Sequence, residues 1–314
     1  MTTRADQVAG GLWGLLVADA VGVPYEFHDA DALPPAHLLD MTPPAGFRRA
    51  HLGTPPGTWS DDGAQALALL DSLLTMGRLD LDDFGARLLA WFHRGAYTPD
   101  GRVFDCGVQT QEALHALRRG VPAATSGRAD ARANGNGALM RVLPLALWHA
   151  GDDASLIADA ERSGLPTHGH LRSGVVCALV CLWARRRMEG DPDGFDAACA
   201  GLRAAYAGDA ARAAELEVAL TTGGPTGSGY VVDTLHGARH ALRVGGQDYA
   251  AAVRAAIGLG GDTDTTACVA GGLAGLRVGV AGIPDAWRAT MRGAEQVDGL
   301  LGRLNQSLAE RRIG

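Results

Sequence analysis

The sequence predicts an all-α protein, and three observations support that prediction. Apolar residues recur at spacings of three and four along most of the chain, which is the pattern of a helix with one buried face. Strict alternation of apolar and polar residues, typical of a half-buried strand, hardly occurs. Many of the periodic segments end at glycine, a frequent residue just beyond the last turn of a helix. We therefore expect a compact bundle of many helices.

The helical pattern is clearest in six segments, in chain order AQALALLDSLLTMG, FGARLLAWFHRG, TQEALHALRRG, ALMRVLPLALWHAG, GVVCALVCLWARRRMEG and AAVRAAIGLG. Two breaks rich in proline or glycine, residues 33–58 and 121–138, interrupt it. Irregular segments of that length inside a helical protein are usually functional loops. A run of small residues at 270–276 permits one helix backbone to approach another closely. No repeat or shift in composition divides the chain, so we expect one domain over residues 1–314.

Composition limits the classes of function. The chain has 314 residues, 47% of them hydrophobic, and a formal net charge of -7, which predicts a full-sized core and argues against nucleic acid as a partner. All 28 basic residues are arginine, which excludes a Walker A loop and a Schiff-base lysine. The apolar run near the amino terminus, flanked by Asp6 and Asp19, is too short for a spanning or secretory segment. We expect a cytoplasmic protein with no membrane partner, and a monomer by default.

Two clusters of oxygen donors lie far apart in the sequence, each at the start of an apolar helical segment. They are Ser60, Asp61 and Asp62 in WSDDGAQALALL, and Asp262, Asp264 and Thr265 in GGDTDTTACVAGG. These residue types also cap helix starts, so either cluster alone has that simpler interpretation. A cap needs only one residue, however, and four carboxylates brought together without a cation would repel one another. Carboxylates and hydroxyls without histidine or cysteine favour Mg²⁺, Mn²⁺ or Ca²⁺.

Two further segments place polar groups beside apolar helices. In GLLVADAVGVPYEF, residues 14–27, Asp19 and Glu26 interrupt an apolar run. In GNGALMRVLPLAL, residues 135–147, a loop of glycine and asparagine leads directly into a helix. Free backbone N–H groups in such a loop can bind an anion, whereas the simpler interpretation is a plain turn.

Taken in order, these four elements resemble the ADP-ribosylglycohydrolase family, almost from end to end. The family's G-D-A-x-G-x-x-x-E is similar to ADAVGVPYE, its T-D-D-T to SDDG, its G-N-G-x-x-M-R to GNGALMR and its G-G-D-T-D-T to GGDTDT. The last two motifs are intact. The resemblance implies an orthogonal all-α bundle with two Mg²⁺ or Mn²⁺ ions in a cleft that binds ADP-ribose.

The resemblance also assigns residues, one position at a time. It implies that the metal ions are held by Ser60, Asp61, Asp62, Asp262, Asp264 and Thr265, with Glu26 beside them. It implies that the ribose and phosphates are lined by Gly135, Asn136, Gly137, Met140 and Arg141, with Thr167 and His168 nearby. Tyr230, in GYVVDTL, is expected at the adenosine end.

Five positions depart from the family pattern. Ala18 replaces a glycine, and HGH at residues 168–170 replaces H-P-D. Ser60 and Gly63 replace the two threonines of T-D-D-T. Serine keeps an oxygen donor, whereas glycine removes a hydroxyl group.

The segment VFDCGVQTQEAL, residues 103–114, resembles the element that distinguishes the arginine-directed members of the family. The resemblance implies that Asp105 faces the scissile bond and the guanidinium group. The alternative is that Asp105 helps to start the following helix. We therefore expect hydrolysis of the N-glycosidic bond between ADP-ribose and an arginine of a protein substrate, with Asp105 and Glu26 as catalytic residues.

Three other functions stay open at this point. The first is hydrolysis of another ADP-ribosyl linkage, to serine or to a small molecule, and the second is binding of ADP-ribose without cleavage. The third is an isoprenoid synthase, which also uses aspartate-rich Mg²⁺ clusters. Its D-D-x-x-D pattern is broken here by Gln65.

Overall fold

The computed structural model describes residues 3–311, which form fourteen α-helices and four short 3-10 helices. The α-helices are α1 (Arg4–Gly22), α2 (Asp61–Met76), α3 (Leu81–Arg94), α4 (Val108–Arg118), α5 (Leu143–Trp148), α6 (Asp153–Ser163), α7 (Leu171–Met188), α8 (Phe195–Ala205), α9 (Ala210–Thr221), α10 (Val231–Gly245), α11 (Tyr249–Ile257), α12 (Thr263–Val278), α13 (Asp285–Thr290) and α14 (Ala294–Glu310). The 3-10 helices are η1 (Val23–Tyr25), η2 (Ala30–Ala32), η3 (Ala36–Leu38) and η4 (Val280–Gly282). Within residues 3–311 the β pairing is confined to three isolated bridges, so the all-α prediction is confirmed.

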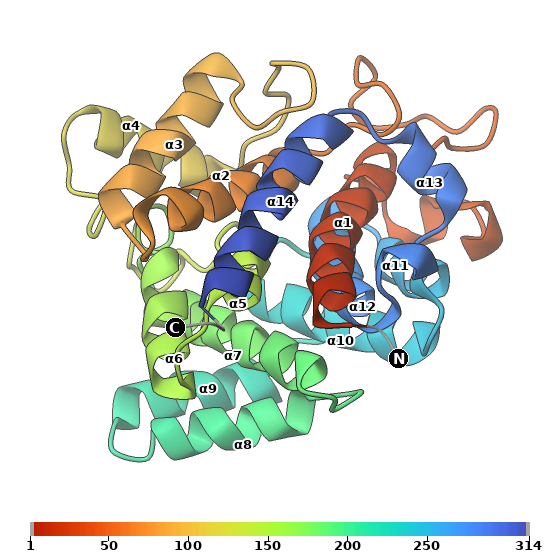
Figure 1. Ribbon diagram of the computed structural model, residues 1–314. Coiled ribbons are helices and arrows are strands. Elements are labelled where there is room, and N and C mark those ends of the chain that lie inside the picture. The colour runs from red at the N-terminus through yellow and green to blue at the C-terminus, as the bar shows by residue number, and fades with distance from the viewer. Residues whose placement is uncertain (1–2, 312–314) are drawn as a thin grey trace.

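Helices α1 and α12 lie side by side at the centre of the molecule (Figure 1). Their backbones touch because glycines face each other along the contact. A Cβ atom added at Gly14 would lie 2.5 Å from the carbonyl oxygen of Gly271, and one added at Gly10 would overlap that of Gly275. The close approach expected for the small-residue segment of α12 is confirmed. Ala18 fits here because its methyl group faces Gly271.

Helix α1 is apolar on nearly every side because other helices surround it. Residues 4–25 are long and apolar enough to cross a membrane by length and composition, but 94% of their most apolar window is buried in the protein. The helix starts with a capping box formed by Thr3 and Asp6. Its apolar sequence therefore matches its place at the centre of the bundle.

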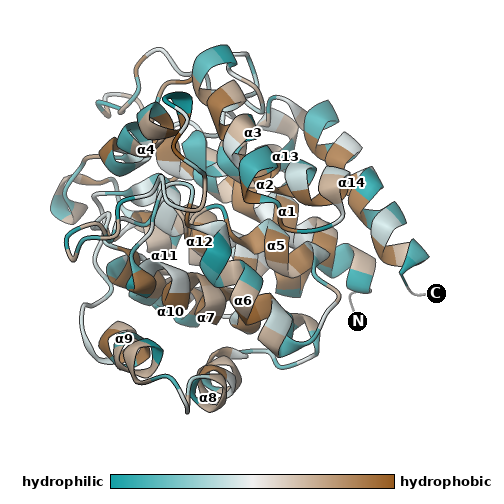
Figure 2. Ribbon diagram, turned by 90° about the vertical axis from the view of Figure 1, so that its left-hand side faces the viewer, coloured by the Kyte–Doolittle hydropathy of each residue, from teal (hydrophilic) through white to brown (hydrophobic). Residues whose placement is uncertain are grey.

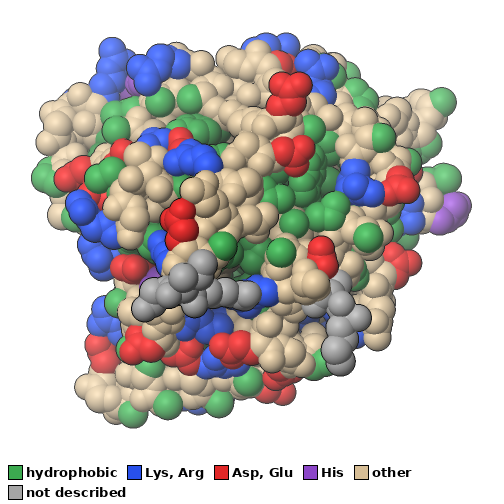
Figure 3. All heavy atoms as spheres, viewed as in Figure 1, with side chains coloured by type: hydrophobic (Ala, Val, Ile, Leu, Met, Phe, Trp, Pro, Cys, Tyr) green, Lys and Arg blue, Asp and Glu red, His purple; other side chains and the backbone are tan. Residues whose placement is uncertain are grey.

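The remaining helices surround this pair. Helices α10 and α11 pack against α12, and α8 and α9 form one edge of the molecule (Figure 1). Polar and apolar stretches alternate along the outer helix α14 (Figure 2), as expected of a helix with one buried face. On the face drawn in Figure 3, acidic and basic side chains are interspersed rather than gathered in a basic patch.

Three helix ends meet at one place, and this convergence positions the site. The carboxylate of Asp19, near the end of α1, accepts hydrogen bonds from the N–H groups of Ser60 (3.0 Å) and Gly63 (2.8 Å) at the start of α2. Thr263, the first residue of α12, donates its hydroxyl group to the carbonyl oxygen of Gly22 at the end of α1 (2.8 Å). Helices α2 and α12 therefore begin close together, although they are far apart in the sequence.

The two irregular segments expected at residues 33–58 and 121–138 are loops in the structure, and the first contains one 3-10 helix, η3. The first loop brings His51 to Glu26, 2.5 Å from its carboxylate. The second pairs with a later segment through a bridge between Gly135 and Tyr230. Both loops thus contribute to the end of the bundle where α2 and α12 begin.

Replacing Gly14 with alanine tests the close packing of α1 and α12. The new methyl group would collide with backbone atoms of Gly271, so we expect the free energy of unfolding to fall by about 3 kcal/mol. Gly299→Ala in α14 is the matched control, because that glycine is exposed with open space around it and alanine favours a helix by about 1 kcal/mol. Urea unfolding followed by circular dichroism measures both variants. Equal stabilities would contradict the packing described here.

Candidate active site

One cavity of about 400 Å³ collects most of the residues that the sequence indicated. Eleven of them line it: Glu26, Asp61, Asp105, Gly135, Asn136, Gly137, Met140, His168, Asp262, Asp264 and Thr265. Four other indicated residues are not among those that line the cavity: Ser60, Asp62, Arg141 and Tyr230. The lining residues come from the starts of α2 and α12, from the loops before α4, α5, α7 and α10, and from the segment after η1. The structure therefore brings the two acidic clusters together, as expected.

Asp62 joins the two clusters. Its Oδ2 atom accepts hydrogen bonds from the hydroxyl groups of Ser60 (3.1 Å), in its own cluster, and Thr265 (3.3 Å), in the other. Its Oδ1 atom is buried and has no hydrogen-bond partner in the part of the chain that the structure describes. A buried carboxylate oxygen without a partner is costly, and a cation would be a suitable partner.

Helix capping explains only one of the two clusters. Ser60 caps α2, because its hydroxyl oxygen accepts the N–H group of Asp62 (3.2 Å). Asp262 stands at the same position of α12, but its Oδ2 atom accepts a hydrogen bond from the side chain of Asn136 (2.9 Å). The carboxylate of Asp262 therefore lies at the cavity instead of closing the start of its own helix.

Burial and mutual repulsion act on these carboxyl groups together. Oxygen atoms of Glu26, Asp262 and Asp264 lie within 4.8 Å of one another. Burial, followed by the charges of Asp105 and Asp262, raises the pKa of Glu26 to about 11. Burial is also the largest cause that raises the pKa of three other buried members of the site, Asp61, Asp62 and Asp264, well above the usual value. Among the described lining residues there is no arginine to balance them.

These residues fit a divalent metal ion. Their donor atoms are carboxylate and hydroxyl oxygens, which suit a hard cation better than zinc. The unpartnered Oδ1 atom of Asp62 and the raised carboxyl pKa values both indicate that this set of side chains lacks a positive charge. The acidic residues therefore form a cluster that could bind metal ions.

Asp19 supports the cluster from behind, a role that we did not assign from the sequence. Its carboxylate is fully buried and fixes the first turn of α2 through Ser60 and Gly63. Burial raises the pKa of Asp19 to about 7. Its position within ADAVGVPYE was the available signal, because that segment resembles a family motif.

A buried chain of polar side chains connects Asp61 to His168. Gln65 donates to Asp61 Oδ2 (3.2 Å) and accepts from Arg141 (2.5 Å). Arg141 also donates to the hydroxyl oxygen of Thr167 (2.6 Å), which is hydrogen-bonded to Nδ1 of His168 (2.7 Å). Burial, followed by the charge of Arg141, lowers the pKa of His168 to about 3, so the imidazole is neutral.

Arg141 therefore has a different place from the one that the resemblance implied. Its side chain is 1% exposed and lies behind the cavity wall, whereas Met140 lines the cavity. Because a guanidinium donates in several directions at once, Arg141 can order Gln65 and Thr167 together. We interpret it as a support for Asp61 and His168 rather than a contact for phosphate.

The loop of residues 135–137 is held by the protein itself. The N–H group of Gly135 donates to Gln109 Oε1 (3.3 Å), and that of Asn136 donates to the carbonyl oxygen of Gly229 (3.1 Å). The expectation of free N–H groups is therefore wrong for these two positions. The loop forms the cavity wall beside His168, where a Cβ atom at Gly137 would lie 2.8 Å from the imidazole.

Tyr230 lies at the start of α10, next to the cavity-lining Gly229. Its hydroxyl oxygen accepts a hydrogen bond from Arg172 (3.1 Å). Contact between Tyr230 and adenosine stays a prediction.

Asp105 lies in the loop before α4 and does not cap that helix. Helix α4 begins at Val108, and its N-cap residue is Gly107, so the capping alternative is wrong. The N–H group of Cys106 donates to Asp105 Oδ1 (2.7 Å), and burial raises the pKa of Asp105. Asp105 is thus free to serve the cavity that it lines.

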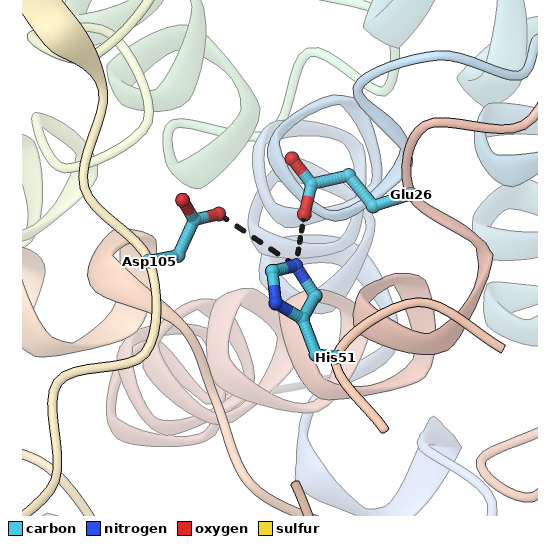
Figure 4. A group of neighbouring side chains, drawn as sticks. All are labelled: Glu26, His51 and Asp105. Carbon is cyan, nitrogen blue, oxygen red and sulfur yellow. Dashed lines mark hydrogen bonds and ion pairs between the residues drawn. The ribbon is translucent and has the colours of Figure 1, made fainter. Parts of the chain in front are cut away.

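His51 was not indicated by the sequence, yet it lies between the two expected catalytic residues (Figure 4). Its Nε2 atom is 2.5 Å from Glu26 Oε2 and 3.9 Å from Asp105 Oδ2. The surrounding HLGTPPGT reads as an ordinary proline- and glycine-rich loop. The sequence therefore contained no motif that would have indicated His51.

Comparison with known proteins agrees with this site. The family model described as ADP-ribosylglycohydrolase matches residues 1–313. The chain belongs to the ADP-ribosylglycohydrolase family. It is similar to "ADP-ribosylarginine hydrolase Tri1" of Serratia proteamaculans, with 29% identity over 95% of this chain and 79% of the relative. It is also similar to "ADP-ribosyl-[dinitrogen reductase] glycohydrolase" of Rhodospirillum rubrum, with 28% identity over 90% and 89% of the two chains.

A solved structure agrees as well. It is described as an "ADP-ribosylglycohydrolase-related protein complex" and matches with a TM-score of 0.76 at 29% identity, over 98% of this chain and 99% of the other. Fold and family together identify the chain as an ADP-ribosyl hydrolase.

The structure accounts for departures from the ADP-ribosylglycohydrolase pattern. A Cβ atom at Gly63 would lie 2.7 Å from Leu16 and 2.8 Å from Trp59, so core side chains fill the space of the missing hydroxyl-bearing residue. His170 replaces an aspartate but still caps α7, because its imidazole accepts the N–H group of Arg172 (3.2 Å). These departures therefore leave the acidic cluster unchanged.

The raised carboxyl pKa values predict how the stability of the metal-free protein depends on pH. A group whose pKa is raised by folding stabilises the native state while it stays protonated, so its contribution is lost as the pH rises through the folded pKa. The contribution of Asp19 is lost between its unfolded pKa and its folded pKa of about 7, whereas that of Glu26 continues to fall up to its folded pKa of about 11. His168, whose pKa falls to about 3 on folding, acts in the opposite direction, but its effect fades above the unfolded histidine pKa of about 6.5. We expect the unfolding temperature in chelator to fall between about pH 6.5 and 8.5.

Adding Mn²⁺ at the same two pH values provides the matched measurement. Because the ion binds ionised carboxylates, its stabilising effect should be larger at the higher pH, and Asp264→Asn should reduce it. Thermal unfolding with chelator and with Mn²⁺ measures both effects. A Mn²⁺ effect that is absent, or equal at both pH values and unchanged in Asp264→Asn, would contradict a metal site here.

Proposed function

We propose that the chain is a metal-dependent hydrolase that cleaves the N-glycosidic bond between ADP-ribose and an arginine side chain of a protein, and so reverses ADP-ribosylation. One observation supports the arginine linkage most strongly: Asp105 and Glu26 line the same cavity as the acidic cluster. A guanidinium group is planar and permanently charged, and it pairs with carboxylates through parallel hydrogen bonds. A serine linkage would bring no such charge to these carboxylates.

The names of two relatives support the same linkage. The Serratia proteamaculans protein and one of Pseudomonas putida, also 29% identical over 90% of this chain, are both named ADP-ribosylarginine hydrolase. Each match covers nine tenths of this chain or more, so the aligned part includes the region of Asp105.

We propose two Mg²⁺ or Mn²⁺ ions as cofactors. The residues that would hold them are Asp61, Asp62, Asp262 and Asp264, with the hydroxyl groups of Ser60 and Thr265. Such ions would supply Lewis acidity toward the sugar hydroxyl groups and the attacking water. We also propose that the ADP-ribose group binds in the cavity, while the modified protein stays outside it.

The side chains of the cavity suit the bond to be broken. Cleavage builds positive charge on the ribose C1″ atom while the guanidine departs, and surrounding carboxylates favour that charge. Asp105 holds the departing guanidine, and Glu26, whose carboxyl group bound cations would keep ionised, takes a proton from the attacking water. We assign the base to Glu26 because its oxygen atoms lie with those of Asp262 and Asp264 within 4.8 Å. His168, whose Nδ1 is bonded to Thr167, presents Nε2 to the ligand.

Matched peptides that carry ADP-ribose on arginine or on serine test the proposed function. We expect release of free ADP-ribose from the arginine peptide with Mg²⁺ or Mn²⁺, and no release in chelator. Release from the serine peptide alone would show that the linkage is wrong. Tight binding of ADP-ribose without release from either peptide would favour a non-catalytic ADP-ribose-binding protein.

Asp105→Asn tests the carboxylate that is expected to face the guanidinium. The amide keeps the size of the side chain but removes the charge, so kcat/KM on the arginine peptide should fall about 100-fold or more. Asp100→Asn, at an exposed position of the same loop, is the matched control and should leave the kinetics unchanged. Similar kinetics in both variants would exclude the proposed role of Asp105.

A further inference from the structure

We propose that His51 is a positioning residue that fixes the carboxylate of Glu26 for catalysis, an inference that rests on the proposed hydrolysis. The closest contact of its imidazole is Nε2 to Glu26 Oε2, at 2.5 Å. The same nitrogen is 3.9 Å from Asp105 Oδ2. Three separate segments of the chain supply these residues, so the imidazole links two loops to the end of η1 (Figure 4).

His51 reaches the two carboxylates from outside the cavity. Glu26 and Asp105 belong to the described lining of the cavity, whereas His51 does not. Its ring packs against Phe27 at 5.5 Å and, edge to face, against Phe104 at 5.0 Å between ring centroids. These contacts fix the imidazole plane. A ligand in the cavity would meet the carboxylates and leave the imidazole behind them, which is why the role is positioning rather than contact with the reacting atoms.

The backbone on both sides of the contact is in an uncommon conformation. Among the non-glycine residues of 3–311, positive φ angles occur only at Phe27 (63°), His51 (48°) and Tyr97 (66°). Two of these three are the residues whose rings touch at this site. Bulky residues adopt the left-handed region at an energetic cost, and such strain concentrates at functional sites. Here it occurs at His51 itself and at Phe27, the residue next to Glu26.

The contact gives the two oxygens of Glu26 different environments. Oε2 is bonded to His51, and the other oxygen points away from the imidazole (Figure 4). Oxygen atoms of Glu26 also lie close to those of Asp262 and Asp264, which repel an unrestrained carboxylate. The bond to His51 holds Glu26 in place against that repulsion. Partners of this kind, one step behind the reacting groups, are needed to keep them oriented.

Kinetics of His51 variants on the arginine-linked peptide test the inference. We expect His51→Ala to lower kcat about 10- to 100-fold, while KM changes by less than about threefold, because the cavity itself is unchanged. His51→Gln should recover much of the loss, since its terminal amide group can occupy the place of Nε2. His51→Asn, whose amide ends nearer the backbone, should not. Leu52→Ala is the matched control, because its side chain is 78% exposed, and it should behave as the native protein.

A double variant shows whether His51 acts through Glu26. In a Glu26→Gln background, His51→Ala should cause little further loss, because the carboxylate that it positions is already absent. If His51→Ala lowers kcat by the same factor in the native protein and in Glu26→Gln, the inference is overturned. So would native kcat in His51→Ala, or equal rates in the alanine and glutamine variants.

The contact can also be measured without turnover, which separates this inference from the proposed function. If the native protein releases ADP-ribose from neither peptide, the proposed function fails, and the ¹⁵N resonance of His51 Nε2 still decides whether the contact exists. We expect that resonance to shift in Glu26→Gln and to be unchanged in Leu52→Ala. The same shift in both variants, or in neither, would overturn the role of His51.

Discussion

Five carboxyl groups line one small cavity, two more lie directly behind it, and the fold has to resist their mutual repulsion. The structure does so by tying together the helix ends that carry them. Asp19 binds the start of α2 to α1, and Thr263 binds the start of α12 to the end of α1. The charges then cannot separate by a simple movement of one helix. Protonation relieves the repulsion in the metal-free protein, as the raised pKa values indicate, and bound cations would relieve it without protonation.

The core behind the cavity makes this arrangement rigid. Helix α12 lies directly against α1 because glycines replace side chains along the contact, so neither helix can shift without opening a gap in the core. On the other side of the cavity, the buried chain through Arg141 links Asp61 to His168. The buried guanidinium of Arg141 also interacts favourably with the charge of Asp61. A site that binds a transition state more tightly than the substrate requires rigid support of this kind.

Sequence reasoning predicted the parts of the site that depend on short motifs. The oxygen donors of SDDG and GGDTDT were recognisable because adjacent carboxylates at a helix start exceed what capping needs. The helical pattern and the small residues of α12 likewise predicted the bundle and its closest contact. Gly63 lacks the hydroxyl group that the family motif has at this position. The structure shows that Trp59 and Leu16 occupy the space of the missing side chain, which no local pattern reveals.

The parts that could not be predicted depend on contacts between distant segments. His51 meets Glu26 only because a loop without regular structure folds back over η1. Arg141 stands in a motif next to the cavity-lining Met140, yet the turn before α5 directs its side chain inward, to Gln65 and Thr167. Neighbouring positions of one motif thus point to opposite sides of the cavity wall. A motif shows which residues are near the site, but not which of them face the ligand.

Equilibrium binding of Mn²⁺ shows whether the buried carboxylates hold cations. Titration calorimetry of the native protein and of Asp264→Ala, with circular dichroism to confirm equal helical content, compares the number of ions bound. We expect two Mn²⁺ ions per native chain and fewer, or more weakly bound, ions in the variant. Equal binding by a folded Asp264→Ala protein, or no binding by the native protein, would contradict it.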